Sequence, residues 1–157
     1  VYFGLGRNHR RAHMTRSVFE SAGFCLMSLC ENIEHYSGID ISSIRVSGGL
    51  SRINLINQIK ADVCNKKVIV LSEFETTAIG GFILITLGLS KIKSLEAGSK
   101  IIKVKEVIYP VQENVERYAK RYQLFKSVYE SLKAEFDNLA KLQEKDIHRI
   151  TKKIENL

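Results

Sequence analysis

The chain has 157 residues, 45% of them hydrophobic, and a formal net charge of +7 at pH 7. These values are typical of one globular domain with room for a short appendage. No run of about 18 apolar residues is present, and the first residues lack the apolar core of a signal peptide. We therefore expect a cytoplasmic protein that does not act on a membrane.

The three cysteines, Cys25, Cys30 and Cys64, are an odd number and lack the paired spacing of a zinc site. Each stands among apolar residues, so we expect three buried thiols in a reducing compartment. His9 and His13 have the spacing of two metal ligands on a helix face, but no Glu lies between them in the metalloprotease pattern. We expect no metal site, and a packing role for both histidines.

Basic residues are concentrated at the start of the chain, where no acidic residue offsets them before position 17: Arg7, Arg10, Arg11 and Arg16. A solvated basic face is the favoured interpretation, and a nucleic-acid surface is the alternative. No aromatic residues alternate with these arginines, as they do in single-strand binders. We therefore expect no nucleic-acid partner.

The first predicted element is a helix over residues 9–34, ended by Gly38. Its apolar residues recur at helical spacing and predict one buried stripe: Met14, Val18, Ala22, Cys25, Leu26, Leu29 and Ile33. A short strand follows at 44–47, and then the glycine pair Gly48–Gly49. A second helix has a predicted inner face of Leu55, Ile56, Ile59 and Val63.

The β-branched run at 68–71 predicts a second strand covered on both faces. The next helix is apolar almost all round, which is typical of a buried helix. Gly80 and Gly81 inside it each cost about 1 kcal/mol relative to Ala, which predicts that another backbone or a ligand passes close by. A third strand is expected within 100–110, ended by the single proline.

Helices between short strands predict an α/β layer with parallel strands, and two such strands would be part of a larger sheet. From residue 111 on, apolar residues recur at steps of three and four along one or two long helices: Tyr118, Tyr122, Phe125, Tyr129, Leu132, Phe136, Leu139, and then Ile147, Ile150, Ile154 and Leu157. This seam predicts packing on the domain up to about Phe136, or self-association.

The glycine pair lies where open α/β sheets bind ligands, at the carboxyl end of a parallel strand before a helix. Without Cβ atoms, the backbone of Gly48 and Gly49 can approach a ligand closely. The N-terminus of the following helix offers N–H groups to an anion, and Ser51 and Arg52 add polar donors. A tight turn without a ligand is the alternative.

The order of several motifs resembles the FGGY family of carbohydrate kinases from about Gly4 to Gln143. The family's strand–Gly-Gly turn, its Gln-x-x-Ala-Asp helix and its Glu-x-Thr-Ala-x-Gly-Ala stretch correspond to Gly48–Gly49, to Gln58 with Ala61–Asp62, and to residues 75–81. The family's His-x-x-Arg-x-x-x-Glu helix corresponds to His13, Arg16 and Glu20. The stretch "EFDNLAKLQ", residues 135–143, is most similar to the gluconate kinase branch.

The resemblance implies a fragment of an actin-like ATPase (ribonuclease H-like) domain with a long C-terminal helical tail. Residues 1–110 would form the second half of the ATP-binding C-terminal domain, and 111–157 would be the helix or helices packed on it. ATP and Mg²⁺ are the implied cofactors. The implied nucleotide contacts are Gly48, Gly49, Ser51, Arg52 and Ile53, although some members have Asn or Ser where this chain has Ile53.

The implied activity is ATP-dependent phosphorylation of a hydroxyl on a sugar or sugar acid, with gluconate favoured over xylulose or glycerol. The family's general-base Asp and phosphate loops would lie upstream of Val1, in the missing N-terminal kinase domain, since neither Asp40 nor Asp62 has the matching place. We therefore expect no catalytic residue here, and no activity from this chain alone. A non-catalytic helical module that forms homo-oligomers is the alternative.

Overall fold

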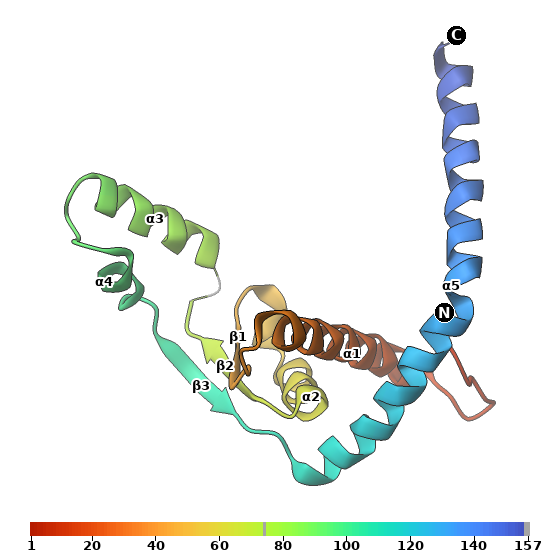
Figure 1. Ribbon diagram of the computed structural model, residues 1–157, viewed down its shortest axis with the longest axis horizontal. Helices are drawn as coiled ribbons and strands as arrows, with labels where there is room; N and C mark the ends of the chain where they lie inside the picture. The colour runs from red at the N-terminus through yellow and green to blue at the C-terminus, as the bar shows by residue number, and fades with distance from the viewer. Residues whose placement is uncertain (74, 156–157) are drawn as a thin grey trace. The chain divides into compact units, whose positions relative to one another are not determined.

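The computed structural model describes the backbone of residues 1–73 and 75–155 and the side chains of 1–73 and 75–144. It divides into two compact units, Val1–Ala119 and Lys120–Leu157. The first unit holds the sheet, most of the helices and the first turns of the long C-terminal helix (Figure 1). Within the described residues, the second unit consists of the rest of that helix.

The elements follow the predicted order, with additions. They are α1 (Arg11–Ser37), β1 (Ser43–Val46), the short 3₁₀ helix η1 (Gly49–Arg52), α2 (Asn54–Cys64), β2 (Lys67–Leu71), α3 (Thr76–Gly88), α4 (Leu95–Ser99), β3 (Val104–Ile108) and α5 (Gln112–Glu155). The expected helices and strands are confirmed to within a few residues, whereas η1 and α4 were not predicted.

The sheet has the order β1-β2-β3, with β1 parallel to β2 and β3 antiparallel to it. Its core is β-branched: Val46 of β1 pairs with Val70 of β2, and both are buried together with Val68 and with Ala61 of α2. The predicted α/β layer with parallel strands is therefore confirmed. The sequence did not predict the direction of the third strand, because no pattern in residues 100–110 distinguishes a parallel from an antiparallel strand.

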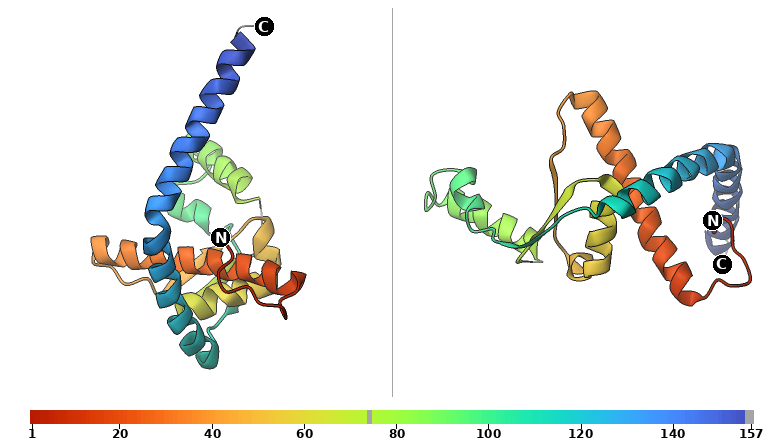
Figure 2. Two further views of the ribbon diagram at one scale, coloured as in Figure 1. Left: turned by 90° about the vertical axis from the view of Figure 1, so that its right-hand side faces the viewer. Right: turned by 90° about the horizontal axis from the view of Figure 1, so that it is seen from below.

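Helices α1 and α2 lie side by side in both views of Figure 2. They approach closely at Gly23, because a Cβ atom added there would lie 3.3 Å from methyl carbons of both Ile59 and Val63. Gly38 ends α1 as expected, with a φ of 67° and its N–H donating to the carbonyl of Glu34 at 3.0 Å. Helix α2 in turn packs on β2 and β3.

The predicted buried stripe of α1 is wrong. The residues that α1 buries are Gly23, Phe24 and Cys30, whereas Met14, Val18, Leu29 and Ile33 are between 37% and 54% exposed. Cys25 is also exposed, which corrects the expectation of three buried thiols, although Cys30 and Cys64 are buried as predicted. The error arose because α1 is apolar on two faces, and periodicity alone does not choose between them.

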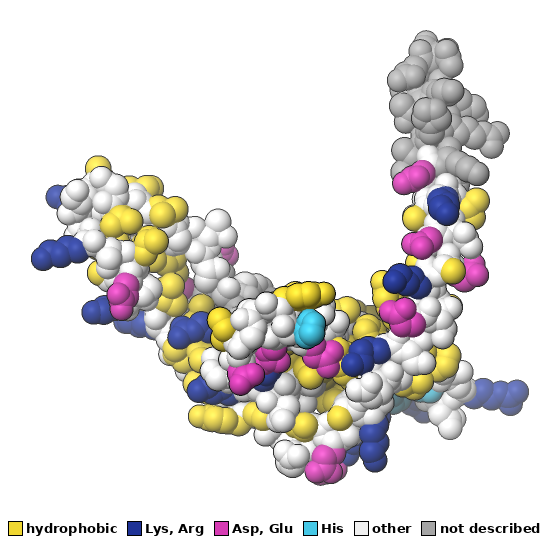
Figure 3. All heavy atoms as spheres, in the orientation of Figure 1, with side chains coloured by type: hydrophobic (Ala, Val, Ile, Leu, Met, Phe, Trp, Pro, Cys, Tyr) yellow, Lys and Arg dark blue, Asp and Glu magenta, His cyan; other side chains and the backbone are white. Residues whose placement is uncertain are grey.

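The predicted burial of α3 is also wrong within the described residues. Only Ile83 of this helix is buried, against α4, while Phe82, Leu84 and Ile85 are more than half exposed. Figure 3 shows hydrophobic side chains at the surface over this helix. No other backbone of the described chain passes Gly80 or Gly81, since a Cβ atom added at either would meet nothing within 4 Å. On α2, Leu55 is exposed rather than inward-facing.

In the second unit, the ring of Tyr129 stacks on that of Phe136, about two helical turns further along, and the ammonium of Lys126 lies 4.4 Å from the ring centre of Tyr122. The helical tail is thus confirmed, while its packing on the domain stays a prediction. The predicted seam residues from Ile147 on lie outside the described side chains. No helix in the described part of the chain is long and apolar enough to cross a bilayer.

A buried carboxylate joins α2 to the start of α5. Asp62 is 2% exposed, and its Oδ1 accepts hydrogen bonds from the backbone N–H of Val111 and from Gln58 Nε2, both at 2.8 Å. Its Oδ2 accepts from Asn114 Nδ2 at 2.9 Å. Because Val111 immediately precedes α5, Asp62 holds the first turn of that helix against α2.

We predict that Asp62→Ala destabilises the protein by about 3 kcal/mol or more, because it leaves a buried N–H group and two amides without their charged acceptor. For a domain of this size that corresponds to a fall of about 6–12 °C in melting temperature, measurable by circular dichroism. Asp40→Ala, the same change at an exposed position, is the matched control. Equal melting temperatures for the two variants would contradict the proposed role of Asp62.

Candidate functional site

The glycine turn at the end of β1 has an open face. Gly48 has a φ of 82°, a left-handed conformation that favours glycine. A Cβ atom added at Gly48 or Gly49 would meet nothing within 4 Å. The turn therefore presents bare backbone to open space at the carboxyl end of a parallel strand, as the sequence predicted.

Two polar residues brace this turn from beneath. The hydroxyl of Ser51 donates to the carbonyl of Gly48 at 2.7 Å, and the Ser51 carbonyl accepts from Asn57 Nδ2 at 2.7 Å. Ser51 is 1% exposed and Asn57 is 0% exposed. Ser51 thus lies under the turn rather than on its open face. Asn57 was missed at the sequence level, because its spacing marks it only as a polar interruption of a buried helix face.

The other predicted nucleotide residues, Arg52 and Ile53, are on the exposed side of the loop, beside the exposed Leu50. The turn does not lead directly into α2, since η1 comes between them. Ile53 is the N-cap of α2, and its backbone carbonyl accepts from the N–H of Ile56 at 3.0 Å, whereas its apolar side chain makes no cap. The surface beside the glycines therefore combines apolar side chains, one guanidinium and a helix N-terminus.

A hydrogen bond connects the glycine turn to α3. The hydroxyls of Ser47 and Thr76 lie 3.2 Å apart, which joins the end of β1 to the start of α3. Gly80 follows Thr76 by one helical turn and so faces the same side of α3. The two open glycine pairs, Gly48–Gly49 and Gly80–Gly81, therefore belong to elements that meet at this contact.

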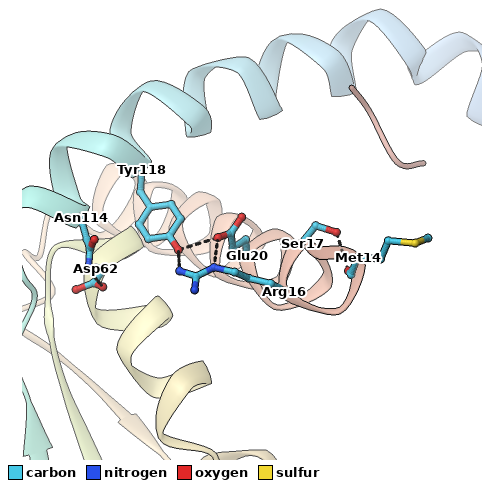
Figure 4. Close-up of polar contacts among 7 residues, drawn as sticks. All are labelled: Met14, Arg16, Ser17, Glu20, Asp62, Asn114 and Tyr118. Carbon is cyan, nitrogen blue, oxygen red and sulfur yellow. Dashed lines mark hydrogen bonds and ion pairs between the residues drawn. The ribbon is translucent and has the colours of Figure 1, made fainter. Parts of the chain in front are cut away.

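The motif residues of α1 form a structural cluster with α5 (Figure 4). Arg16 Nε donates to Glu20 Oε1 at 2.9 Å, and Arg16 Nη2 donates to the hydroxyl of Tyr118 at 3.2 Å. Tyr118 in turn donates to Glu20 Oε1 at 2.9 Å and is 3% exposed. Burial raises the pKa of Tyr118, and the hydrogen bonds to Glu20 and Tyr118 raise the pKa of Arg16. Sequence reasoning had placed Tyr118 only in the helical seam.

His13 accepts a hydrogen bond from the backbone N–H of Arg10 at the start of α1, and its ring meets that of His9 edge to face, 5.6 Å away. The described part of the chain has no group of three or more His, Cys, Asp or Glu placed to hold a metal ion. Asp40 is exposed in a loop, and every oxygen of Asp62 is engaged in the contacts that hold α5.

Comparison with known proteins identifies the protein family to which the chain belongs. Residues 1–88, more than half of the chain, match the model of the C-terminal domain of the FGGY family of carbohydrate kinases. The chain belongs to this family, as its motifs predicted, and its fold is the family's actin-like ATPase fold.

Individual relatives act on different substrates. The chain is 34% identical over 119 residues to a glycerol kinase of Saccharolobus islandicus (76% of this chain and 24% of that one), and 26% identical over 142 residues to a gluconokinase of Bacillus licheniformis (90% and 28%). It therefore spans about a quarter of the length of these curated relatives.

Solved structures agree on the fold. A xylulose kinase from Lactobacillus acidophilus matches 88% of this chain and 28% of its own, with a TM-score of 0.79 at 20% identity. A Plasmodium falciparum glycerol kinase solved with ADP matches 83% and 26%, with a TM-score of 0.69 at 24% identity.

We predict that Tyr118→Phe lowers the free energy of unfolding by about 1–2 kcal/mol at neutral pH, since it removes two hydrogen bonds to charged groups. Because the folded state raises the pKa of Tyr118, this contribution is present below the unfolded pKa of about 10 and is lost as the pH rises above it. Urea unfolding at pH 7 and above pH 10 measures the difference between the variant and the parent. The exposed Tyr36→Phe is the control, and a difference independent of pH would contradict this role for Tyr118.

Proposed function

We propose that this chain is the C-terminal portion of an ATP-dependent kinase that phosphorylates a hydroxyl of a sugar or sugar acid, and that it supplies the adenine-nucleotide side of the cleft. Gluconate is the favoured substrate, because residues 135–143 resemble the gluconate kinase branch, and the match to the gluconokinase covers 142 residues against 119 for the glycerol kinase. Xylulose and glycerol are the alternatives.

The observation that carries the proposal is the open Gly48–Gly49 turn. Gly48 has a φ of 82°, and no side chain covers Gly48 or Gly49, so the backbone is exposed at the carboxyl end of β1. A flat base can lie directly against such a backbone, and the exposed apolar side chains of Leu50 and Ile53 suit its faces. The Plasmodium falciparum glycerol kinase, whose structure resembles this chain, was solved with ADP, and this supports a nucleotide as the ligand of the turn.

Each predicted nucleotide residue then has a distinct role. Gly48 and Gly49 form the contact surface, Ile53 adds apolar area, and the Arg52 guanidinium offers positive charge toward the phosphates. Ser51 acts indirectly, since its one hydroxyl proton is donated to Gly48 and its backbone carbonyl is held by Asn57. Ser51 and Asn57 are therefore positioning residues for the turn.

The phosphoryl-transfer machinery is proposed to lie outside these 157 residues. Phosphoryl transfer depends on a positioned acceptor hydroxyl and on Mg²⁺ bridging the phosphates. The described part of the chain has no metal-binding cluster, and Asp62 is buried with its oxygens occupied. We assign the general base and any Mg²⁺ ligands to the N-terminal kinase domain that the longer relatives have, and no step to this chain beyond holding and orienting the nucleotide.

The remaining assignments follow from the same proposal. All three thiols are free, which suits the reducing cytoplasm where sugar phosphorylation would occur. The partners are the sugar or sugar-acid substrate and the N-terminal domain, with no role for nucleic acid or membrane. Residues 1–110 form the nucleotide-binding part, and 111–157 the helical tail. The competing proposal is that the chain forms homo-oligomers through the apolar side chains of α5. A measured molecular mass above that of one chain would support it.

We predict that Gly49→Val, in the protein at its natural length, raises the KM for ATP by about tenfold or more, equivalent to about 1.4 kcal/mol of lost binding. The KM for the sugar should change little. The branched side chain would occupy the space proposed for the nucleotide, while the fold tolerates it because φ at Gly49 is not positive and nothing lies within 4 Å. Steady-state kinetics in both substrates measures this split.

Gly88→Val is the matched control for this substitution, because Gly88 also lacks a positive φ and a Cβ atom there meets nothing within 4 Å. It should leave both KM values unchanged. An equal rise in the two KM values for Gly49→Val would show that the turn does not contact the nucleotide.

We also predict that the 157-residue chain alone phosphorylates no sugar. A nucleotide held without an opposed hydroxyl and a base gains nothing from positioning. The measurement is a coupled ADP-release assay with gluconate, xylulose and glycerol on the purified chain. Sugar-dependent turnover that survives repeated purification would place the catalytic residues within this chain, and Asp40 and Asp62 would be the first to test.

A further inference from the structure

The loop between the glycine turn and α2 has an unfavourable residue at its end. Ile53 is the N-cap of α2, with an extended backbone at a φ of −97° and a ψ of 103°. Ser, Thr, Asn and Asp are preferred at an N-cap, because their side-chain oxygens accept a hydrogen bond from the second or third N–H of the helix, whereas Ile is among the least favoured residues there. The first turn of α2 also has no acidic residue. The start of α2 therefore lacks the cap that a polar residue would supply.

The packing of Ile53 does not compensate for the missing cap. Its side chain is 42% exposed, whereas Ile56 and Ile59, which α2 contributes to the core, are 4% and 2% exposed. A residue that breaks a local stability rule without a gain in the core is typical of a functional site. Ile53 follows Gly49 by four residues, on the side of the loop where the nucleotide is proposed to bind.

Two backbone acceptors of this loop are already saturated. The carbonyl of Gly48 accepts from the N–H of Ser51 at 3.1 Å and from its hydroxyl at 2.7 Å. The carbonyl of Ile53 also accepts twice, from the N–H groups of Ile56 at 3.0 Å and of Asn57 at 3.3 Å. Because a carbonyl oxygen has two lone pairs, neither of these groups has one left to accept a hydrogen bond from a ligand.

The polar side chains of the loop do not supply an acceptor in their place. Ser51 and Asn57 are buried beneath the turn, where Asn57 Nδ2 holds the carbonyl of Ser51. The apolar side chains exposed beside the glycines are those of Leu50, at 63%, and Ile53. Arg52 is also exposed, but a guanidinium carries only donors. A base lying on the turn therefore meets an apolar surface without an exposed side-chain acceptor from this loop.

The chemistry of the purines gives this surface a consequence. Adenine and guanine share the acceptor N7 and differ at position 6, where adenine has an amino donor and guanine has a carbonyl acceptor. Selection of adenine therefore requires an acceptor directed at its amino group. A site with such a hydrogen bond rejects the analogue that lacks the group by about 10⁴-fold or more, whereas an apolar site discriminates far less. The faces of both rings suit the same apolar side chains.

We propose that Ile53 sets the phosphoryl-donor specificity of this site: its side chain lies against the base and admits the purine nucleoside triphosphates as a class, with ATP, GTP and ITP all serving as donors. This inference rests on the proposed function, since it concerns the nucleotide at the Gly48–Gly49 turn. Selection is by contact area, so the smaller rings of CTP and UTP make them poorer donors. An apolar residue at the N-cap preserves this contact at the expense of the start of α2.

Donor specificity is the first test, in the protein at its natural length. The γ-phosphoryl group passes to the sugar hydroxyl, which loses its proton, and the corresponding nucleoside diphosphate is released and measured by ion-exchange chromatography. The acceptor is whichever of gluconate, xylulose and glycerol is phosphorylated with ATP. The kcat/KM values for GTP and ITP should lie within about tenfold of that for ATP, and those for CTP and UTP should fall below this range.

Ile53→Asn is the second test, because it separates the two effects of the residue. An Asn cap should slow amide hydrogen exchange at residues 55 and 56 by about fivefold, while the KM values for ATP and GTP should both rise by about fivefold or more. A merely structural role would not raise KM in a variant whose helix start is more stable. Ile53→Val should keep both KM values within about twofold. Ile101→Asn, at a similarly exposed position of 44%, is the matched control and should change neither KM.

Three results would overturn the proposal. One is a preference of more than about tenfold for a single purine nucleotide, which would show that the base edge is read; if that nucleotide is GTP, Arg52 is the first residue to test. Another is equal use of CTP, UTP and ATP. The third is an unchanged KM for both nucleotides in Ile53→Asn. If Gly49→Val raises the KM for ATP in a protein that gives any of these results, the turn binds the nucleotide and only the role of Ile53 is wrong. If Gly49→Val also leaves that KM unchanged, the proposed function of the turn fails.

Discussion

The first unit depends on one buried carboxylate. Asp62, at the end of α2, accepts hydrogen bonds from the backbone just before α5 and from Asn114 in its first turn. This contact holds the start of α5 against α2. One helical turn after Asn114, the hydroxyl of Tyr118 donates to Glu20 on α1. Because α1 also packs on α2 through Gly23, the three helices hold one another pairwise.

Helix α2, one of these three helices, also supports the glycine turn. α2 packs on the sheet with its polar Asn57 facing inward, and this amide holds the carbonyl of Ser51. The turn is thereby supported from the protein side, and its outer side is left bare at Gly48 and Gly49. A backbone surface that is rigid on one side and open on the other suits a flat ligand, because binding then requires little reorganisation of the protein. The support is buried and polar, and the contact surface carries no side chain.

Much of the fold and part of the candidate site follow from local sequence. β-branched runs, helical periodicity and glycine at chain reversals predict the helices, the two parallel strands and the turn, because these preferences operate over a few residues. The sequence did not reveal that Ser51 supports the turn instead of contacting a ligand. A serine beside a glycine pair looks the same in the sequence whether its hydroxyl faces the protein interior or the open side of the turn. The hydrogen bond from Ser51 to Gly48 distinguishes the two.

The sequence by itself determined the family, the order of the elements and the position of the glycine turn, since each is encoded in residue types at fixed spacings. Only the tertiary structure decided which face of α1 is buried. Both faces are apolar, so periodicity treats them alike, and the choice is made by long-range contacts: Gly23 admits α2, and Glu34 and Glu20 find Lys66 and Tyr118 on the inner side. Charged groups half-buried in an interface need such partners, and their location is known only once the chain has folded.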